Sequence, residues 1–331
     1  MTPDASTDDN GDARAVAHPN IALVKYWGKA ERAGNVPAVP SLSITLDTLS
    51  SDTRVELIDA DADEVRLNDR PAPDAVTTRV SGFLDLVRAQ AADERRARIT
   101  TVNNFPTAAG LASSASGFAA LALASTRAFG LTLNGAALSA LARQGSGSAA
   151  RSLYGGFVEM AGPDAQSPSA TQIEPKEHWP LNVVVAVTAT EQKRHLSTDG
   201  MNLTRDTSPF YPAWIESHAR DMIDAREAVL GRDFAALARV SEHSCLKMHG
   251  LMMSAQPGLV YWNPATLACL ERVRALRADG VEVFFTIDAG AQVKAVCTPR
   301  HAGDVNEALS GVPGVVETLH VGLGGDARLV G

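Results

Sequence analysis

Apolar and polar positions in the first third of the chain predict short strands followed by one helix. Residues 41–46 alternate polar and apolar side chains with a period of two, as in a half-buried strand, and residues 20–29 are also extended. Segments 54–58 and 64–68 flank a turn rich in Asp and Ala, which suggests a β-hairpin. From 74 to 92, apolar residues recur on one face at helical spacing.

The central part of the chain predicts a strand, a loop and a helix rich in small residues. A strand at 98–102 leads directly into a loop at 103–110, and the helix after it runs to about residue 129. A turn at Asn134-Gly135 follows. Next come a short helix at 136–143, a Gly/Ser loop at 145–148 and strands near 153–160 and 181–189.

The pattern becomes more helical from Pro209 onward. It predicts helices at about 210–229, 232–247 and 264–278, strands at 281–287 and 292–297, a helix at 301–309, and strands near 315–321 and 327–330. Helices that alternate with non-adjacent strands favour an α+β fold over a doubly wound parallel sheet. We expect a disordered tail at 1–15, an N-terminal domain at 16–190 and a C-terminal domain at 191–331.

Composition and charge limit the kinds of molecule that the protein is expected to bind. The chain has 331 residues, 45% of them apolar, which is enough for about two cored domains. Its net charge of −8 argues against general nucleic-acid binding, although a few basic groups in one cleft can still attract phosphorylated metabolites. Three scattered cysteines, Cys245, Cys269 and Cys297, do not form a disulfide framework, so a reducing cytosol fits best.

Neither a secretory signal nor a membrane span is predicted. The first ten residues have no basic start and no apolar core. The most apolar stretch, 108–133, consists mostly of Ala and Gly and is interrupted by serines and Arg127. A close-packed helix is therefore favoured over a membrane span, which needs about twenty strongly apolar residues.

A run of small residues from Pro106 to Gly117 is the strongest local signal for chemistry. Between a strand and a helix, such residues leave backbone N–H groups open at the helix N-terminus, where the helix dipole favours anions. Ser113 and Ser114 add hydroxyls that can bind phosphate oxygens or a magnesium-bound water. No Lys follows the second Gly, as a P-loop would require. The run indicates either a phosphate-binding loop or a tightly packed helix start.

A second small-residue loop, Gly145-Ser146-Gly147-Ser148, is followed by Arg151. This loop could bind a second anion, because it combines flexible glycines and two hydroxyls with a guanidinium three residues after the loop. The same sequence is also typical of the end of a helix followed by a turn.

Two lysines, Lys25 and Lys29, flank Tyr26 and Trp27 in an otherwise apolar segment. In a strand, Lys25 and Trp27 would share one face and Tyr26 the other. A buried Lys is costly unless it meets an anion. The alternative is an edge-strand lysine that prevents unwanted strand pairing.

Asp288 ends the apolar run 284–287 and precedes Ala289-Gly290. It could cap a turn, or it could be a general base, because desolvation raises the basicity of a carboxylate.

Three residues on one predicted helix, His243, Cys245 and His249, are candidate metal ligands. Two ligands one turn apart on one helix, without paired cysteines elsewhere, do not make a zinc site, so a packed helix is favoured.

Together, these clusters resemble the diphosphomevalonate decarboxylases of the GHMP kinase superfamily. The likeness spans about residues 18–331. It includes Asn20-Ile21-Ala22, Lys25-Tyr26-Trp27-Gly28-Lys29, Ser41-Leu42-Ser43, segments 103–114 and 145–156, Ser197, Gly200-Met201, Thr204, Thr207-Ser208 and Asp288-Ala289-Gly290. The resemblance implies two domains: an N-terminal one like the second domain of ribosomal protein S5, with a left-handed βαβ crossover, and a ferredoxin-like C-terminal one.

The resemblance also implies an activity. Such proteins use ATP and magnesium to convert mevalonate 5-diphosphate to isopentenyl diphosphate, carbon dioxide, ADP and phosphate. They are usually cytosolic homodimers, and neither a nucleic acid nor a membrane is expected as a partner.

Site residues follow from the same resemblance. ATP would be bound by Asn104, Pro106, Ala109, Gly110, Leu111, Ala112, Ser113 and Ser114, with Ser113 or Ser114 near magnesium. Substrate would be bound by Tyr26, Lys29, Ser146, Ser148, Arg151, Ser197 and Met201. Asp288 would take the proton of the 3-hydroxyl, or orient it, as it attacks the γ-phosphate, and Lys25 would keep Asp288 ionised.

Two positions depart from the family pattern. Ala291-Gln292 follow Gly290 where the family commonly has Pro-Asn, and Thr198 stands where many bacterial relatives carry an Arg that helps to hold substrate. Mevalonate 5-phosphate is therefore an alternative substrate. A mevalonate 3-kinase of the same fold and a non-catalytic nucleotide-binding module are alternative functions, but the presence of both Lys25 and Asp288 favours the decarboxylase.

Overall fold

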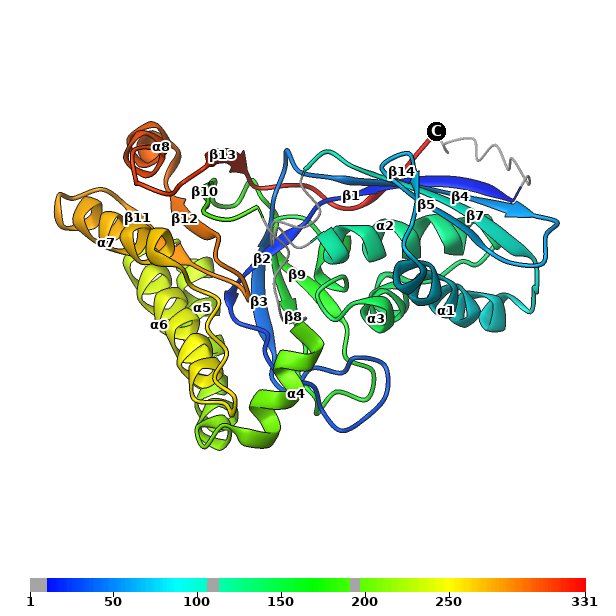
Figure 1. Cartoon of the computed structure of the whole chain (residues 1–331), viewed down its shortest axis with the longest axis horizontal. Coiled ribbons are helices and arrows are strands. Elements are labelled where there is room, and N and C mark those ends of the chain that lie inside the picture. The colour runs from blue at the N-terminus through cyan, green and yellow to red at the C-terminus, as the bar shows by residue number, and fades with distance from the viewer. Residues whose placement is uncertain (1–10, 106–112, 191–196) are drawn as a thin grey trace.

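The computed structural model describes residues 11–105, 113–190 and 197–331. These residues form three β-sheets and the helices packed on them. Figure 1 shows an elongated molecule with two lobes: a six-stranded sheet lies in one, the helices α5 to α8 lie in the other, and a small sheet lies between them.

The first lobe contains the sheet of order β14-β1-β4-β7-β5-β6. Its strands are β1 (Asp12–Ala17), β4 (Ser51–Ile58), β5 (Glu64–Leu67), β6 (Arg70–Pro71), β7 (Arg96–Asn103) and β14 (Arg328–Val330). The helices α1 (Asp74–Ala91) and α2 (Ser113–Ala128) cover one face of this sheet, and α3 (Gly135–Gly145) packs against both helices (Figure 1). β5 and β7 run parallel and are joined through α1, which makes a βαβ unit.

Small side chains let α2 lie close to strands β1 and β4. Ala119, Ala120, Ala122 and Ala124 are fully buried in the core of this lobe. The Ser116 hydroxyl lies 2.7 Å from that of Ser51 on β4. The close-packed helix expected from the sequence is confirmed, and no helix in the described part of the chain is long and apolar enough to cross a membrane.

Two predictions in this lobe are wrong. The segments 54–58 and 64–68 do not form a hairpin, because β7 lies between β4 and β5 and pairs with both. The predicted tail 1–15 does not extend to residue 15, because residues from Asp12 onward form β1 and pair with β4 and β14. Both errors arise from pairing with segments far away in the sequence, which a local pattern does not reveal.

The sheet between the lobes has the order β2-β3-β8-β9. Its strands are β2 (Asn20–Val24), β3 (Ser41–Thr45), β8 (Phe157–Met160) and β9 (Ala170–Glu174). β2 and β3 are buried along their whole length. The predicted strand 20–29 is shorter than expected, so Lys25 and Trp27 lie in the loop after β2, where both are buried.

The second lobe has a four-stranded antiparallel sheet of order β11-β12-β10-β13. Its strands are β10 (Asn182–Val187), β11 (Val283–Thr286), β12 (Val293–Cys297) and β13 (Glu317–Gly322), with the helices α7 (Pro264–Ala278) and α8 (Ala302–Ser310). The succession β10-α7-β11-β12-α8-β13 in this strand order is a ferredoxin-like arrangement, as expected. Three further helices, α4 (Ser197–Thr207), α5 (Tyr211–Gly231) and α6 (Phe234–Met253), are inserted between β10 and α7.

Some elements were not predicted or begin elsewhere. The helix α4 and the strand β9 were missed, and the predicted strand near 153–160 begins at Phe157 because a short helix, η1 (Arg151–Leu153), precedes it. A second short helix, η2 (Pro299–His301), precedes α8.

The pairing of β10 places this strand with the C-terminal half of the chain. This strand pairs with β12 and β13, although the sequence-based boundary near 190 groups it with the N-terminal half. We therefore propose a boundary just before Asn182.

One hydrophobic core joins the two halves. Ile21 of β2 and Ile44 of β3 share it with Val185 of β10 and Phe284 of β11, and with apolar residues of α5 and α6. Since both halves contribute to the same core, we expect them to unfold together.

Phe284→Ala tests this shared core. Phe284 is fully buried and its ring contacts Phe234 at a centroid distance of 5.5 Å. We expect the substitution to lower the free energy of unfolding by about 3–5 kcal/mol. The exposed Leu267, changed to Ala, is the control and should alter it by less than about 0.5 kcal/mol. Calorimetry should show one transition in each variant; two separate transitions would contradict a shared core.

Candidate active site

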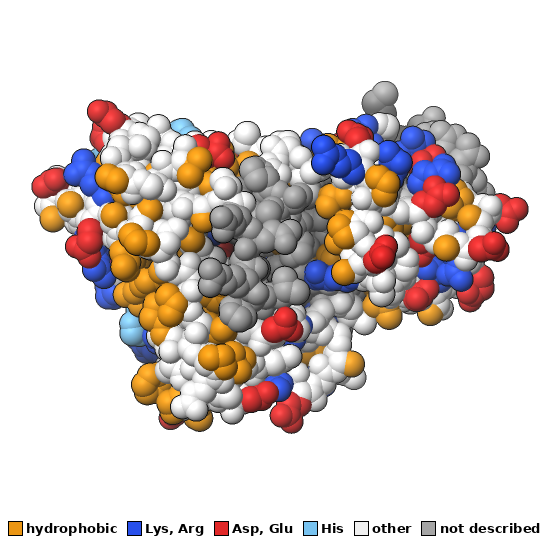
Figure 2. All heavy atoms as spheres, in the orientation of Figure 1, with side chains coloured by type: hydrophobic (Ala, Val, Ile, Leu, Met, Phe, Trp, Pro, Cys, Tyr) orange, Lys and Arg blue, Asp and Glu red, His pale blue; other side chains and the backbone are white. Residues whose placement is uncertain are grey.

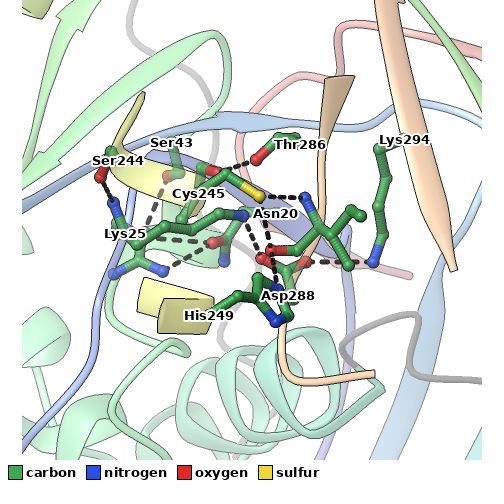
Figure 3. A network of polar contacts seen from close by, with 12 residues as sticks. Asn20, Lys25, Ser43, Ser244, Cys245, His249, Thr286, Asp288 and Lys294 are labelled. Carbon is green, nitrogen blue, oxygen red and sulfur yellow. Dashed lines mark hydrogen bonds and ion pairs between the residues drawn. The ribbon is translucent and has the colours of Figure 1, made fainter. Parts of the chain in front are cut away.

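The centre of the candidate site is a carboxylate held by two buried lysines. Lys25 Nζ lies 2.6 Å from Asp288 Oδ1, and Lys294 Nζ lies 3.2 Å from Asp288 Oδ2. The side chains of Lys25 and Lys294 are 1% and 2% exposed, whereas that of Asp288 is 30% exposed. Figure 3 shows the two ammonium groups approaching the carboxylate from opposite sides. Asp288 therefore has one open side for a ligand.

Helix α6 holds the segments that carry these groups. The backbone N–H of Lys25 donates to Ser244 Oγ at 3.0 Å, and the backbone N–H of Ile287 donates to Cys245 Sγ at 3.2 Å. The Thr286 hydroxyl donates to the Ala22 carbonyl at 3.2 Å, which ties the end of β11 to β2. Lys25 and Asp288 thus meet because these hydrogen bonds tie β2, β11 and α6 together.

The metal hypothesis for α6 finds no support in the arrangement of its residues. Cys245 and His249 are buried against Ile287, whereas His243 is exposed. Burial lowers the pKa of His249 to about 3, so this imidazole is neutral near pH 7. The described residues contain no group of three or more candidate ligands that could hold a metal ion.

Electrostatics favour the ionised form of Asp288. Burial alone would raise the pKa of Asp288, but the charges and hydrogen bonds of Lys25 and Lys294 lower it well below its ordinary value. Burial lowers the pKa of Lys294, and the charge of Asp288 offsets part of that effect. Two lysines against one carboxylate leave one positive charge at the base of the site.

Arg151 is a second buried cation. It is 2% exposed, and its guanidinium donates to Asn20 Oδ1, Ser43 Oγ and Ser41 Oγ at 2.7–3.2 Å. These partners are neutral, and within the described residues Arg151 forms no ion pair. Burial lowers the pKa of Arg151 to about 10, which still leaves it charged at neutral pH. A buried cation with only neutral partners is suited to an anionic ligand.

Tyr26 lies beside Arg151, whose guanidinium is 5.9 Å from the centre of its ring. The Tyr26 hydroxyl is buried and has no hydrogen-bond partner within the described residues, and burial raises its pKa to about 12. It lies against Gly147, where any side chain would overlap it. An orphaned hydroxyl at this position indicates a bond that a ligand would complete.

The two small-residue loops meet at the start of α2. The Ser146 hydroxyl donates to Ser114 Oγ at 3.4 Å and lies 3.4 Å from Ser148 Oγ. Ser113 and Ser114 form the first turn of α2, where the helix dipole favours an anion. Hydroxyl groups beside such a site also suit magnesium, which prefers oxygen ligands.

Part of the predicted ATP loop is outside the described residues: Pro106, Ala109, Gly110, Leu111 and Ala112. Asn104 is described, and its amide bonds the backbone of the preceding loop. It accepts from the Ser50 N–H and donates to the Thr48 carbonyl, both at 2.8 Å. Its side chain thus holds the loop after β3, and its predicted contact with ATP stays a prediction.

Lys29, a predicted substrate-binding residue, contacts the start of α4. Lys29 Nζ donates to Thr198 Oγ1 at 3.0 Å and to Asn35 Oδ1 at 2.8 Å. Burial lowers the pKa of Lys29, and the nearby charge of Arg79 adds to this effect. Ser197 begins α4, whereas the side chain of Met201 is buried in a core cluster with Trp27.

Lys294 is the site residue that the sequence interpretation missed. It is the one charged residue in the apolar strand β12, Val293–Cys297. The reasoning applied to Lys25, that a buried lysine needs an anion, would have selected it as well.

Two family models match the chain: the diphosphomevalonate decarboxylase-like N-terminal domain over residues 17–171 and the mevalonate 5-diphosphate decarboxylase C-terminal domain over 183–316. The chain belongs to the diphosphomevalonate decarboxylase family. The resemblance seen in the sequence and the fold that it implied are both confirmed.

Three similar proteins represent the range of matches. A diphosphomevalonate decarboxylase of Candida albicans is 36% identical, over 84% of this chain and 82% of its own length. A phosphomevalonate decarboxylase of Haloferax volcanii is 33% identical, over 96% and 97%. A solved structure described as MDDEF in complex with MVAPP, AMPPCP and magnesium is 37% identical, covers 96% of this chain and 98% of its own, and has a TM-score of 0.91.

Ala291 and Gln292, which replace the family's usual Pro-Asn after Gly290, support the turn through hydrogen bonds of their own. Gln292 Oε1 accepts from the Thr188 N–H at 2.6 Å, and its amide donates to the Ala189 carbonyl at 2.5 Å. The Ala291 carbonyl accepts from the Thr266 hydroxyl at 2.7 Å. The turn after Asp288 is therefore tied to the end of β10 and to the first turn of α7.

Arg151→Met tests whether Arg151 serves a ligand or the fold. Met leaves Asn20 Oδ1 and the Ser41 hydroxyl without the guanidinium but also removes an unpaired buried charge, so we expect a loss of ligand-free stability of only about 1–3 kcal/mol. Most of the rise in Tm that mevalonate 5-diphosphate produces should be lost as well. The control is Arg88→Met, which removes another buried arginine, one paired with Asp63 at 2.9 Å; it should cost about 3–5 kcal/mol of stability. Similar losses of ligand-free stability in both variants would contradict a ligand-binding role for Arg151.

Proposed function

We propose that this protein catalyses the ATP-dependent decarboxylation of mevalonate 5-diphosphate, giving isopentenyl diphosphate, carbon dioxide, ADP and phosphate. The observation that carries the proposal is an ionised carboxylate between two buried lysines, close to a buried arginine that has only neutral partners. Membership of the diphosphomevalonate decarboxylase family supports the same reaction.

The carboxylate of Asp288 would act on the substrate's tertiary 3-hydroxyl. Because its pKa is lowered, it is ionised near neutral pH and can accept the hydrogen bond of that hydroxyl. The oxygen then attacks the γ-phosphorus of ATP, and the bond from that phosphorus to the bridging oxygen breaks, which releases ADP. The proton of the hydroxyl passes to Asp288. Lys25 offsets the negative charge that gathers near the reacting groups.

Phosphorylation turns a poor leaving group into a good one. When phosphate departs, the tertiary carbon becomes electron-poor, and the bond between the neighbouring methylene carbon and the carboxylate carbon breaks. The electron pair of that bond forms the alkene, and carbon dioxide is released. The protein's role in this step is to hold the substrate in place while the charges separate.

Binding of the substrate and of ATP would be divided among the groups already described. Arg151, Tyr26, Lys29, Ser146 and Ser148 would hold the carboxylate and diphosphate of the substrate, and the backbone around Ser197 to Met201 would close the pocket. The loop before α2 would hold the ATP phosphates. Magnesium, present in the complex with AMPPCP, would neutralise phosphate charge near Ser113 or Ser114.

One observation favours a second candidate, the decarboxylation of mevalonate 5-phosphate. Thr198 offers a neutral hydroxyl to Lys29, where many bacterial relatives carry an arginine. A substrate with one phosphate fewer has less negative charge, so fewer cationic side chains are needed to bind it. The Haloferax volcanii relative is named a phosphomevalonate decarboxylase.

We also propose that the protein is a cytoplasmic homodimer. The three cysteines are free and buried, in keeping with a reducing compartment. Helix α5 exposes Ile215, Ile223 and Leu230, which suits a surface that a second copy would cover. Figure 2 shows apolar side chains on the lobe that contains α5 to α8 and mixed charges on the other lobe. Sedimentation velocity measures the oligomeric state directly.

Asp288→Asn tests the role of the carboxylate. We expect kcat to fall by about 10²–10⁴-fold, since the amide cannot accept a proton, while both ligands still bind. Asp304→Asn changes an exposed carboxylate on α8 and serves as the control, with unchanged kcat. Near-normal turnover of the Asp288→Asn variant would remove Asp288 from its assigned role.

Thr198→Arg tests the choice of substrate. Mevalonate, its 5-phosphate and its 5-diphosphate are each supplied with ATP and magnesium, and ADP and carbon dioxide are measured in the same reaction. We expect the native protein to prefer the diphosphate and Thr198→Arg to raise that preference about fivefold to tenfold, through an added charged contact. Thr198→Val, which adds no charge, should leave the preference unchanged.

The same assay separates the other functions. Preference of the native protein for the monophosphate would favour the second candidate. ADP without carbon dioxide would indicate a 3-kinase, and no turnover of any of the three would contradict an enzyme of this class.

A further inference from the structure

Lys294 occupies an unusual position for a charged residue. It lies in the middle of the second lobe's sheet, opposite Thr286 of β11 and Val185 of β10. Both faces of this sheet are covered, and every residue of β12 is buried. A lysine in such a strand destabilises the fold unless its charge is compensated.

Asp288 is the one carboxylate in the described part of the chain that forms an ion pair with Lys294. The other titratable groups around this pair do not compensate the charge. Lys25 is a cation, and Cys245 and His249 on α6 are neutral because burial raises the pKa of the thiol to about 11 and lowers that of the imidazole to about 3. Arg151 adds more positive charge nearby. Lys294 is therefore placed to act on Asp288 alone.

The two lysines hold different oxygens of the same carboxylate. Lys25 bonds Oδ1 and Lys294 bonds Oδ2, and the lysines come from segments on opposite sides of the site (Figure 3). With a single partner, a carboxylate can rotate about its last side-chain bond. With both partners, its plane is fixed, and its free lone pairs face the open side in one orientation.

We propose that Lys294 is a positioning residue for the reaction: it fixes the plane of the Asp288 carboxylate by holding Oδ2, so that the substrate hydroxyl meets an oxygen in a set direction. The role rests on the proposed function. The side chain of Lys294 is 2% exposed, so the role assigned to it is exerted through Asp288, whose side chain is 30% exposed.

Lys294→Met removes the charge and keeps the length of the side chain. We expect kcat to fall about 10- to 100-fold because the carboxylate is misplaced, while KM stays within about twofold. The acid limb of the kcat profile should move to higher pH, since Asp288 loses one of the two cations that lower its pKa. Lys247→Met is the matched control: Lys247 pairs with Asp221 at 2.6 Å, outside the site, and its loss should leave kcat and the pH profile unchanged.

A double variant separates positioning from a merely structural role. In the Asp288→Asn background, Lys294→Met should lower kcat by less than about twofold more, because Lys294 acts through Asp288. If the double variant instead loses kcat by the product of the two single losses, the proposal is wrong. Lys294→Gln keeps a donor without the charge and should have an intermediate kcat; it replaces the Met variant if that variant does not fold.

The outcomes distinguish this role from the proposed function. Normal kcat in a folded Lys294→Met or Lys294→Gln variant, beside an active native protein, overturns only the role of Lys294. Absence of turnover by the native protein, with each of the three mevalonate substrates, overturns the proposed function and this role with it.

Discussion

The contact between Asp288 and its two lysines is the constraint on which the site depends. Each lysine is buried, and a buried ammonium is stabilised only if an anion meets it. Lys25 follows a strand of the sheet between the lobes, whereas Lys294 lies within the sheet of the second lobe. The carboxylate that compensates both therefore requires these sheets to stay together. The shared core of β2, β3, β10 and β11 and the contacts of α6 keep them so.

The same arrangement places an excess of positive charge at the base of the site in an acidic protein. The chain carries a net charge of −8, but the base of the site keeps the excess charge of the two lysines and that of Arg151. These cations lie where water has little access, so their fields are weakly screened. Hydroxyls of the two small-residue loops add neutral donors beside them. A phosphorylated carboxylic acid supplies the negative charge that this environment lacks.

The Asp288 carboxylate is held by contacts on both sides of it along the chain, without the family's usual Pro-Asn. The backbone on one side of Asp288 bonds Cys245, and the turn on the other side is held by Gln292 and by the hydroxyl of Thr266. Gln292 bonds two backbone groups at the end of β10, so a proline is not needed to fix the loop. The orientation of Asp288 is thus set by several elements of the second lobe.

The sequence by itself determined the elements whose signals are local: the amphipathic helix α1, the small-residue helix α2 and the strand that ends before Asp288. It also determined the motifs through which the family was recognised. Only the tertiary structure decided which strands pair, since β7 separates the two segments of the expected hairpin and Asp12–Ala17 gains its partners from distant residues. It also decided that Lys294 joins Lys25 at Asp288. Backbone pairing and charge compensation between distant residues depend on position in space, which a local pattern of side chains does not specify.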